Sequence, residues 1–166
     1  MAGRGCANVR RLRRLILKLR RRVDVRGRVH VGPGVRIDVA PGARVILEDG
    51  CSLGEHCRID AAGGVVRIGP NARIGERAIL VAVAGIEIGA GADVGDWAVI
   101  ADADPAFADG PQPVRVGDGA RIGIHAAILA GATVAAGEEI APYATRAPGR
   151  ASGPGGQETR APRSSA

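Results

Sequence analysis

The stretch VGDGAR IGIHAA ILAGAT VAAGEE IAPYAT, residues 116–145, divides into five groups of six residues. Each group begins with Val or Ile, and Ala follows four places later in all but one, where Glu138 stands instead. The same spacing extends toward the N-terminus, with VGPGVR at 31–36 and LGEHCR at 53–58. Aliphatic residues also begin the groups at Ile68, Ile74, Leu80, Ile88, Val94 and Ile100.

A period of six fits neither a long helix, which repeats every 3.6 residues, nor a plain hairpin, whose strands repeat every two. It fits short strands joined by tight turns, in which Gly, Asn or Asp supplies the turn conformation. Three groups then make one triangular coil, and coils stack about 4.8 Å apart so that like residues lie on like. The core becomes a column of aliphatic side chains, which explains why Phe, Trp and Tyr occur once each.

The repeat over 29–145 resembles that of the hexapeptide-repeat acyltransferases. Residues 114–134, VRVGDGARIGIHAAILAGATV, are most similar to the O-acetyltransferase branch, which includes galactoside, maltose and lipopolysaccharide acetyltransferases. The resemblance implies an all-β fold, a left-handed parallel β-helix that assembles as a homotrimer. It also implies transfer of an acetyl group from acetyl-CoA, bound in the groove between neighbouring helices, to a hydroxyl of a sugar or surface-polysaccharide precursor.

Charge divides the chain into three parts. Residues 1–28 carry eleven basic residues and one acid, residues 29–145 carry eight basic and fifteen acidic residues, and the last twenty-one carry four and one. We therefore expect a basic segment at 1–28, a β-helix domain at 29–145 with an irregular loop at 101–114, and a disordered, Pro/Gly/Ser-rich tail at 146–166. The net charge of +6 hides this acidic body between basic ends.

The segment VRRLRRLILKLRRRV, residues 9–23, has the apolar spacing of an amphipathic helix. It fits a cap over the open end of the β-helix, which protects an exposed strand edge. It also fits attachment to an anionic membrane surface through 9–28. Nucleic-acid binding is the weakest of the three interpretations, because no aromatic platform accompanies the basic residues, and we expect no nucleic-acid partner.

The repeat breaks at ADADPAFAD, residues 101–109. In the similar O-acetyltransferases this loop carries the histidine that removes the proton from the acceptor hydroxyl. Here the aspartates and the Phe of that loop are kept, but Ala103 and Pro105 stand at the two histidine positions. The candidates for the base are therefore Asp102, Asp104 and His125, the last in IGIHAA one strand after the loop.

The resemblance also assigns an acetyl-CoA surface. The residue that contacts the pantetheine arm corresponds to Ile124, and a second residue along the arm corresponds to Pro142. Arg146 lies close to the place of an expected lysine, and Arg115 and Arg121 are further candidates to meet phosphate groups. Because both Ile124 and Pro142 are larger than the small residues normally found there, the pocket departs from the family pattern.

Other classes of function find little support. His30, His56 and His125 are widely separated, and the three cysteines show no zinc-binding spacing, so we expect no metal. An odd cysteine count without a signal peptide favours the cytoplasm, or the inner face of the membrane for a peripheral protein. The alternative to an enzyme is a catalytically degenerate trimeric β-helix that serves as a scaffold or interaction protein.

Overall fold

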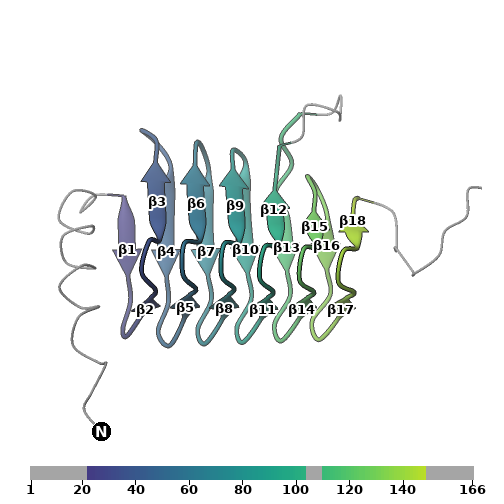
Figure 1. Cartoon of the computed structure of the whole chain (residues 1–166). Coiled ribbons are helices and arrows are strands. Elements are labelled where there is room, and N and C mark those ends of the chain that lie inside the picture. The colour runs from purple at the N-terminus through teal and green to yellow at the C-terminus, as the bar shows by residue number, and fades with distance from the viewer. Residues whose placement is uncertain (1–21, 104–109, 149–166) are drawn as a thin grey trace, which may run out of the picture.

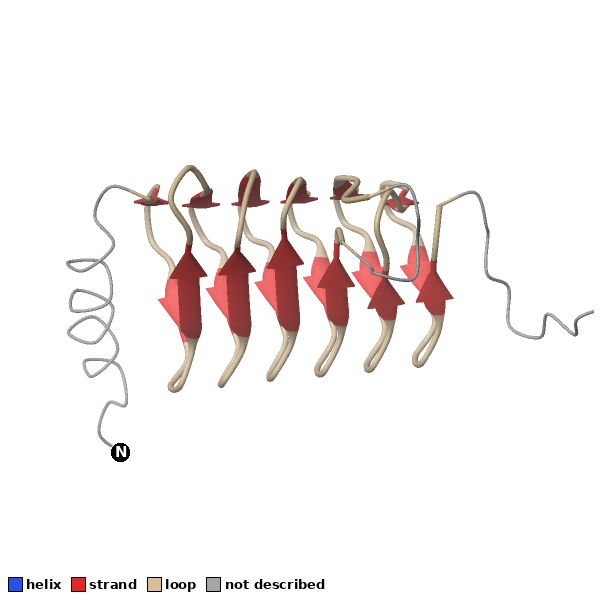
Figure 2. Cartoon of the chain, turned by 90° about the horizontal axis from the view of Figure 1, so that it is seen from above, coloured by secondary structure: helices blue, strands red, loops and turns tan. Residues whose placement is uncertain are grey.

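The computed structural model describes residues 22–103 and 110–148, and in these ranges the chain forms a parallel β-helix (Figure 1). Each coil contributes one strand to each of three parallel sheets, so that successive strands of one sheet lie three strands apart in sequence. Figure 2 shows the three rows of strands, with the turns joining them at the corners. The all-β, hexapeptide-repeat solenoid predicted from the sequence is thereby confirmed.

Sheet A contains β1 (Val23–Val25), β4 (Arg44–Leu47), β7 (Val65–Ile68), β10 (Gly85–Ile88), β13 (Val114–Val116) and β16 (Thr133–Val134). Sheet B contains β2 (His30–Val31), β5 (Ser52–Leu53), β8 (Arg73–Ile74), β11 (Asp93–Val94), β14 (Arg121–Ile122) and β17 (Glu139–Ile140). Sheet C contains β3 (Arg36–Val39), β6 (Arg58–Ala61), β9 (Ile79–Ala82), β12 (Val99–Ala101), β15 (Ala127–Ile128) and β18 (Thr145–Arg146).

The strand register places equivalent residues of successive coils directly over one another. In sheet C, one inward-facing column runs through Ile37, Ile59, Leu80, Ile100 and Ile128. These side chains are almost completely buried, as are the matching columns of sheets A and B. Burial of such aliphatic side chains stabilises the fold by about 1.5–3 kcal/mol each.

The β-helix extends further toward the N-terminus than residue 29, where the sequence pattern places its start. Strand β1 begins at Val23 and pairs with β4 from Val23↔Val45 to Val25↔Leu47. Val23 therefore packs into the core of the first coil. Residues 9–21 of the predicted helix, the loop residues 104–109 and the tail from 149 onward lie outside the described residues. Among the described residues, no helix is long and apolar enough to cross a membrane.

Small residues form a second set of columns under the corners. Between sheets A and B the column runs through Cys51, Ala72, Ala92 and Ala120, and between sheets B and C it runs through Cys57, Ala78, Ala98 and Ala126. Both cysteines thus stand at positions where later coils carry alanine. Burial raises the pKa of the Cys51 thiol to about 11 and that of the Cys57 thiol to about 12.

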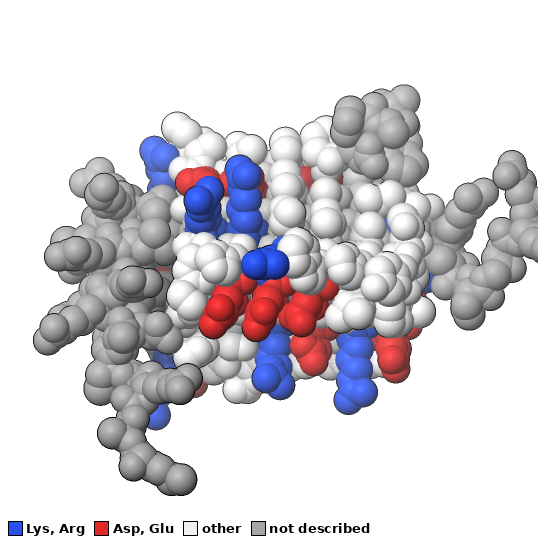
Figure 3. Space-filling view, viewed as in Figure 1, with Lys and Arg blue, Asp and Glu red and all other residues white. Residues whose placement is uncertain are grey.

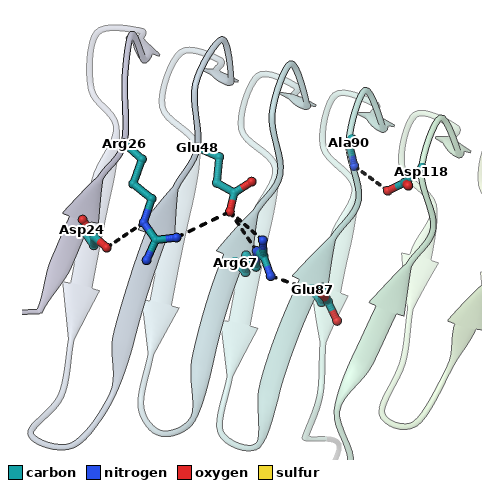
Figure 4. Close-up of polar contacts among 7 residues, drawn as sticks. All are labelled: Asp24, Arg26, Glu48, Arg67, Glu87, Ala90 and Asp118. Atoms are coloured by element: carbon teal, nitrogen blue, oxygen red, sulfur yellow. Dashed lines mark hydrogen bonds and ion pairs between the residues drawn. The ribbon is translucent and has the colours of Figure 1, made fainter.

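The outer surface of sheet A is bridged by charged side chains of alternating sign (Figure 4). The Arg67 guanidinium lies 2.7 Å from a carboxylate oxygen of Glu48 and 4.0 Å from one of Glu87, each on a neighbouring coil. Arg26 pairs with Asp24 at 2.9 Å and reaches Glu48 at 4.0 Å. Except for Glu48, whose side chain is 16% exposed, these groups are about half exposed, and such exposed pairs add less than about 1 kcal/mol each.

Burial predicts that Cys51 and Cys57 are chemically silent in the folded protein, because alkylation needs an accessible thiolate. In a Cys6→Ser variant at about pH 9, where an ordinary thiol is largely ionised, iodoacetamide should label neither cysteine, and denaturant should expose both. Mass spectrometry measures the added groups. Rapid labelling of either thiol without denaturant would contradict the buried positions.

Candidate active site

Between β12 and β13 the chain leaves the β-helix and rejoins it within one coil. The Gln112 amide N–H donates to the Asp102 carbonyl oxygen at 2.8 Å, and the Gly131 N–H donates to the Gln112 carbonyl oxygen at 3.0 Å. These bonds join the two ends of the excursion between sheets C and A and tie them to the following coil. Asp104 and Pro105 fall among residues 104–109 and so lie outside the described residues.

Asp102 is the one charged or polar residue that is completely buried in the described parts of the chain. Its Oδ1 accepts the Val83 N–H at 2.7 Å, and its Oδ2 accepts the N–H groups of Ala84, at 2.8 Å, and Gly85. The carboxylate therefore closes the turn between β9 and β10 on the preceding coil. These donors compensate for burying the negative charge.

This environment argues against Asp102 as the base that the sequence suggested. A general base must come within hydrogen-bond reach of the acceptor hydroxyl. The Asp102 carboxylate has no exposed surface, and both its oxygens already accept backbone hydrogen bonds. The structure gives this residue the role of anchoring the loop, and that role accounts for an aspartate at the second position of the break.

His125 lies at the corner between sheets B and C, in a column of planar side chains. The centroid of its imidazole ring is 5.7 Å from that of Trp97 and 5.1 Å from that of Tyr143, and the planes are inclined by 12° and 7°. The Arg77 guanidinium covers the other face of Trp97, 4.7 Å from the ring centroid. Stacking on both faces fixes the imidazole plane and leaves the ring edge toward solvent.

The planar side chains at this corner belong to residues whose backbone is left-handed, a conformation that usually favours glycine. His56, Arg77, Trp97, His125 and Tyr143 all adopt a left-handed conformation, with φ between 53° and 61°. At the corner between sheets A and B the same conformation is taken by residues suited to it: Gly27, Gly50, Asn71, Gly91, Gly119 and Gly137. A residue with a β-carbon is less stable in this conformation by roughly 1–2 kcal/mol. The stacking contacts therefore offset a backbone penalty that the other corner avoids.

Two of the residues assigned to acetyl-CoA flank His125. Ile124 is 45% exposed and precedes it, while the Tyr143 N–H, next to Pro142, donates to the Ile124 carbonyl oxygen at 2.9 Å. A Cβ on Gly123 would lie 2.4 Å from the Pro142 nitrogen, so the two coils are in close contact here. The structure thus brings Ile124, His125 and Pro142 together and provides an apolar surface beside the imidazole.

The arginines predicted for the phosphate groups do not gather in one place. Arg115 projects from sheet A and Arg121 from sheet B. Arg146 is in register with Ile128 at the end of an aliphatic column of sheet C, and its guanidinium lies 2.6 Å from the Glu138 carboxylate. Arg146 and Glu138 therefore close the C-terminal end of the core, which explains the exception to the alanine pattern. The described residues fit an apolar arm but supply no cluster of cations for phosphates.

Grooves also lie on the described parts of sheets A and B, apart from the stacked column of Arg77, Trp97, His125 and Tyr143. The first, about 240 Å³, lies on sheet A beside the anchored loop, over Gly85 and between Val65 and Pro113. The second, about 640 Å³, follows sheet B, and Glu55, Glu76 and Asp96 contribute to its lining. Acidic side chains form a row across the middle coils in Figure 3. Within 22–103 and 110–148, no group of three acidic, histidine or cysteine side chains is placed to hold a metal ion.

Comparison with known proteins shows the fold. No protein-family model matches the chain, and no curated protein matches its sequence. Among solved structures it is similar to a mutant of AntD, an N-acyltransferase from Bacillus cereus in complex with dTDP and coenzyme A. The match has 18% identity and a TM-score of 0.54, and covers 78% of this chain and 77% of that one.

A second match is the acetyltransferase domain of PglB from Neisseria gonorrhoeae in complex with acetyl coenzyme A. It has 19% identity, a TM-score of 0.32, and coverage of 83% of this chain and 65% of that one. What the similarity to the AntD structure shows is the shared β-helix fold.

The column of rings was missed as a unit in the sequence, although the signal is visible there. Each of its members comes directly before the small residue of its group, as in IGERAI, VGDWAV, IGIHAA and IAPYAT. Groups of six that align Arg77, Trp97, His125 and Tyr143 in one slot predict that these side chains stack. The Arg146–Glu138 pair was signalled in the same way, by Glu138 at an alanine position.

Asp102→Asn should destabilise the fold by about 3 kcal/mol, because an NH2 group would replace one acceptor oxygen and face backbone donors. The control is Asp118→Asn, whose carboxylate accepts one bond, from the Ala90 N–H at 2.7 Å, on the surface (Figure 4). That change should have an effect below about 1 kcal/mol. Urea unfolding of both variants measures the difference, and equal effects would contradict the anchoring role.

Glu138→Ala and Arg146→Leu should each destabilise the last coil, because each removes the opposite charge from a partially buried partner. The double variant should lose about 1 kcal/mol less than the two single losses together. Thermal and urea unfolding of the four proteins completes the cycle. Strictly additive losses would show that the 2.6 Å contact does not couple the two residues.

Proposed function

We propose that this protein is an acyltransferase that moves an acetyl group from acetyl-CoA to a hydroxyl group of a sugar or surface-polysaccharide precursor, as a homotrimer. The proposal rests first on the sequence resemblance to the O-acetyltransferases. It is supported by similarity to AntD, whose structure carries CoA and dTDP, over more than three quarters of both chains. A fold alone does not define a reaction, so the argument depends on the site.

The observation that carries the proposal is the position of His125. Of the three candidate bases, Asp102 is buried and fully hydrogen-bonded, and Asp104 is not described, whereas the His125 ring edge faces solvent. Trp97 and Tyr143 hold the ring plane, which limits the orientations that a bound acceptor would meet. Ile124 and Pro142 provide the adjoining apolar surface expected for the pantetheine arm.

In this mechanism the neutral His125 imidazole takes the proton from the acceptor hydroxyl as its oxygen attacks the thioester carbonyl carbon. The carbon–oxygen bond forms and the carbon–sulfur bond breaks, and the imidazolium returns the proton to the departing CoA sulfur. Acetyl-CoA supplies the activated acyl group when it is bound. The chain contributes the proton acceptor, the fixed ring plane and the apolar surface at the corner.

Purified protein should release free thiol from acetyl-CoA in the presence of a panel of sugar acceptors, including amino sugars. His125→Asn should lower kcat at least about 100-fold, because it removes the base but keeps a residue suited to the left-handed backbone. His56→Asn is the matched control, since His56 has the same slot and φ value three coils earlier. It should keep kcat within about twofold.

Unchanged turnover in His125→Asn would remove His125 from the mechanism and leave Asp104 as the remaining candidate base.

A second function, that of a scaffold without catalysis, is favoured by one specific observation. Ala103 stands where the resemblance calls for a histidine, and the neighbouring Asp102 is committed to the turn at 83–85. Absence of both thiol release and CoA binding by calorimetry would support the scaffold instead of the enzyme.

A further inference from the structure

The groove on sheet B has a floor without side chains. Each of the first four coils contributes one glycine to it, and these are Gly32, Gly54, Gly75 and Gly95. A Cβ on Gly54 would lie 2.6 Å from the Glu76 nitrogen, and one on Gly75 would lie 2.6 Å from the Asp96 nitrogen, so neither position accepts a larger residue. The floor is therefore a continuous trough of backbone along the β-helix, with a volume of about 640 Å³.

Carboxylates form one wall of this groove. Glu55, Glu76 and Asp96 occupy the same place in the groups LGEHCR, IGERAI and VGDWAV, so they follow one another in successive coils, about 4.8 Å apart. On the other side of the glycine floor, Asp93 adds a fourth carboxylate, and Arg73 is the one arginine or lysine among the described residues of the lining. Four carboxylates against one guanidinium give the groove an excess of negative charge.

These carboxylates differ from those of sheet A in having no cationic partner. On sheet A, Glu48 and Glu87 lie 2.7 Å and 4.0 Å from nitrogen atoms of one arginine. Among the described residues, the Glu55 and Glu76 side chains make no ion pair or hydrogen bond, and the Asp96 carboxylate accepts one bond, from the backbone N–H of Glu76 at 2.8 Å. Because like charges one coil apart repel one another, a ligand with positive charges is attracted along the length of the groove.

The groove ends beside the proposed active site. Ile124 is the last residue of the lining, and His125 follows it directly in the chain. The His125 N–H donates to the Asp96 carbonyl oxygen at 2.9 Å, which fixes the coil that carries the imidazole against the last carboxylate of the row. A linear molecule that lies in the groove therefore brings one of its ends to His125.

We infer that this groove binds an extended saccharide whose sugars carry protonated amino groups, and that it places a hydroxyl group at the end of that saccharide beside His125. The repeat of one coil, about 4.8 Å, is close to the length of one sugar in an extended chain, so successive ammonium groups meet successive carboxylates. Sugars linked to a nucleotide diphosphate fit poorly, because their phosphate groups would face the same carboxylates. The binding stands by itself, whereas the role of this saccharide as acetyl acceptor rests on the acyl transfer proposed above.

Titration calorimetry on the full wild-type chain, without acetyl-CoA, measures the binding apart from turnover. The probe is the glucosamine tetramer at slightly acidic pH, where its amines are protonated. The matched ligand is the N-acetylated tetramer, which has the same length and no charge. The charged tetramer should bind at least about tenfold more tightly, since several exposed ion pairs form together, and its affinity should fall as salt is added.

Substitutions in the groove test the location of the site. Glu55→Gln and Glu76→Gln should each weaken binding of the charged tetramer about two- to fivefold. Arg73→Gln should strengthen it, because the substitution removes the guanidinium from the lining. Glu139→Gln is the matched control, since Glu139 is exposed on β17 of the same sheet but does not line the groove, and its affinity should equal that of the wild type. Circular dichroism should show that all variants are folded.

The inference is overturned by equal affinity for the two tetramers, by unaltered binding in both groove glutamine variants, or by an equal loss in Glu139→Gln. Spermine tests charge alone, and a spermine affinity that matches that of the charged tetramer would show that the groove does not select a saccharide. Thiol release from acetyl-CoA is measured separately. Tetramer binding without thiol release would contradict the acyl transfer and leave the binding site standing, whereas release with neutral acceptors alone would contradict the groove as acceptor site and leave the transfer standing.

Discussion

Hydrogen bonding between successive coils fixes the register of this protein, and most of its other features depend on that register. The Gly32 N–H donates to the Leu53 carbonyl oxygen, and the Gly54 N–H donates to that of Ile74 in the next coil. A one-residue slip would turn every inward side chain outward. Each position in the coil is therefore repeated as a column through the molecule, and a column can be aliphatic, small, charged or planar.

Columns explain how a protein so poor in aromatic residues can still concentrate them. Its single Trp and Tyr, together with His125, share one slot in three successive coils and stack there. The position of a side chain in space consequently follows from its place in the group of six and from the coil that carries it. Ile124 and Pro142, which are 18 residues apart in sequence, therefore become neighbours. The loop between β12 and β13 interrupts the repeat without shifting the register, because Asp102 and Gln112 fasten its two ends.

The repeat made the solenoid predictable, since branched aliphatics at every sixth position leave few alternatives. It could not reveal that Val23 joins the first coil, because VDV beside a basic, helix-like segment contains no complete group of six. Asp102 was misread for a different reason. Nothing in the sequence around Asp102 indicates that its side chain is buried. Its three N–H donors come from the turn at 83–85, about twenty residues earlier in the chain. Ile124 and Pro142 are neighbours because they occupy the same slot in successive coils, and their contact with acetyl-CoA stays a prediction.

The Arg146–Glu138 pair affects whether further chains can add strands to the C-terminal end of the β-helix. A β-helix ends in an unpaired strand edge at each pole, and such an edge is a template on which another chain can add strands. At the C-terminal pole the aliphatic column ends in a guanidinium and the alanine column ends in a carboxylate. A chain stacked on this pole would have to bury both charged groups beneath its own core. The sequence of the last coil thus resists fibre growth at that pole, and it does so within the same period of six that builds the fold.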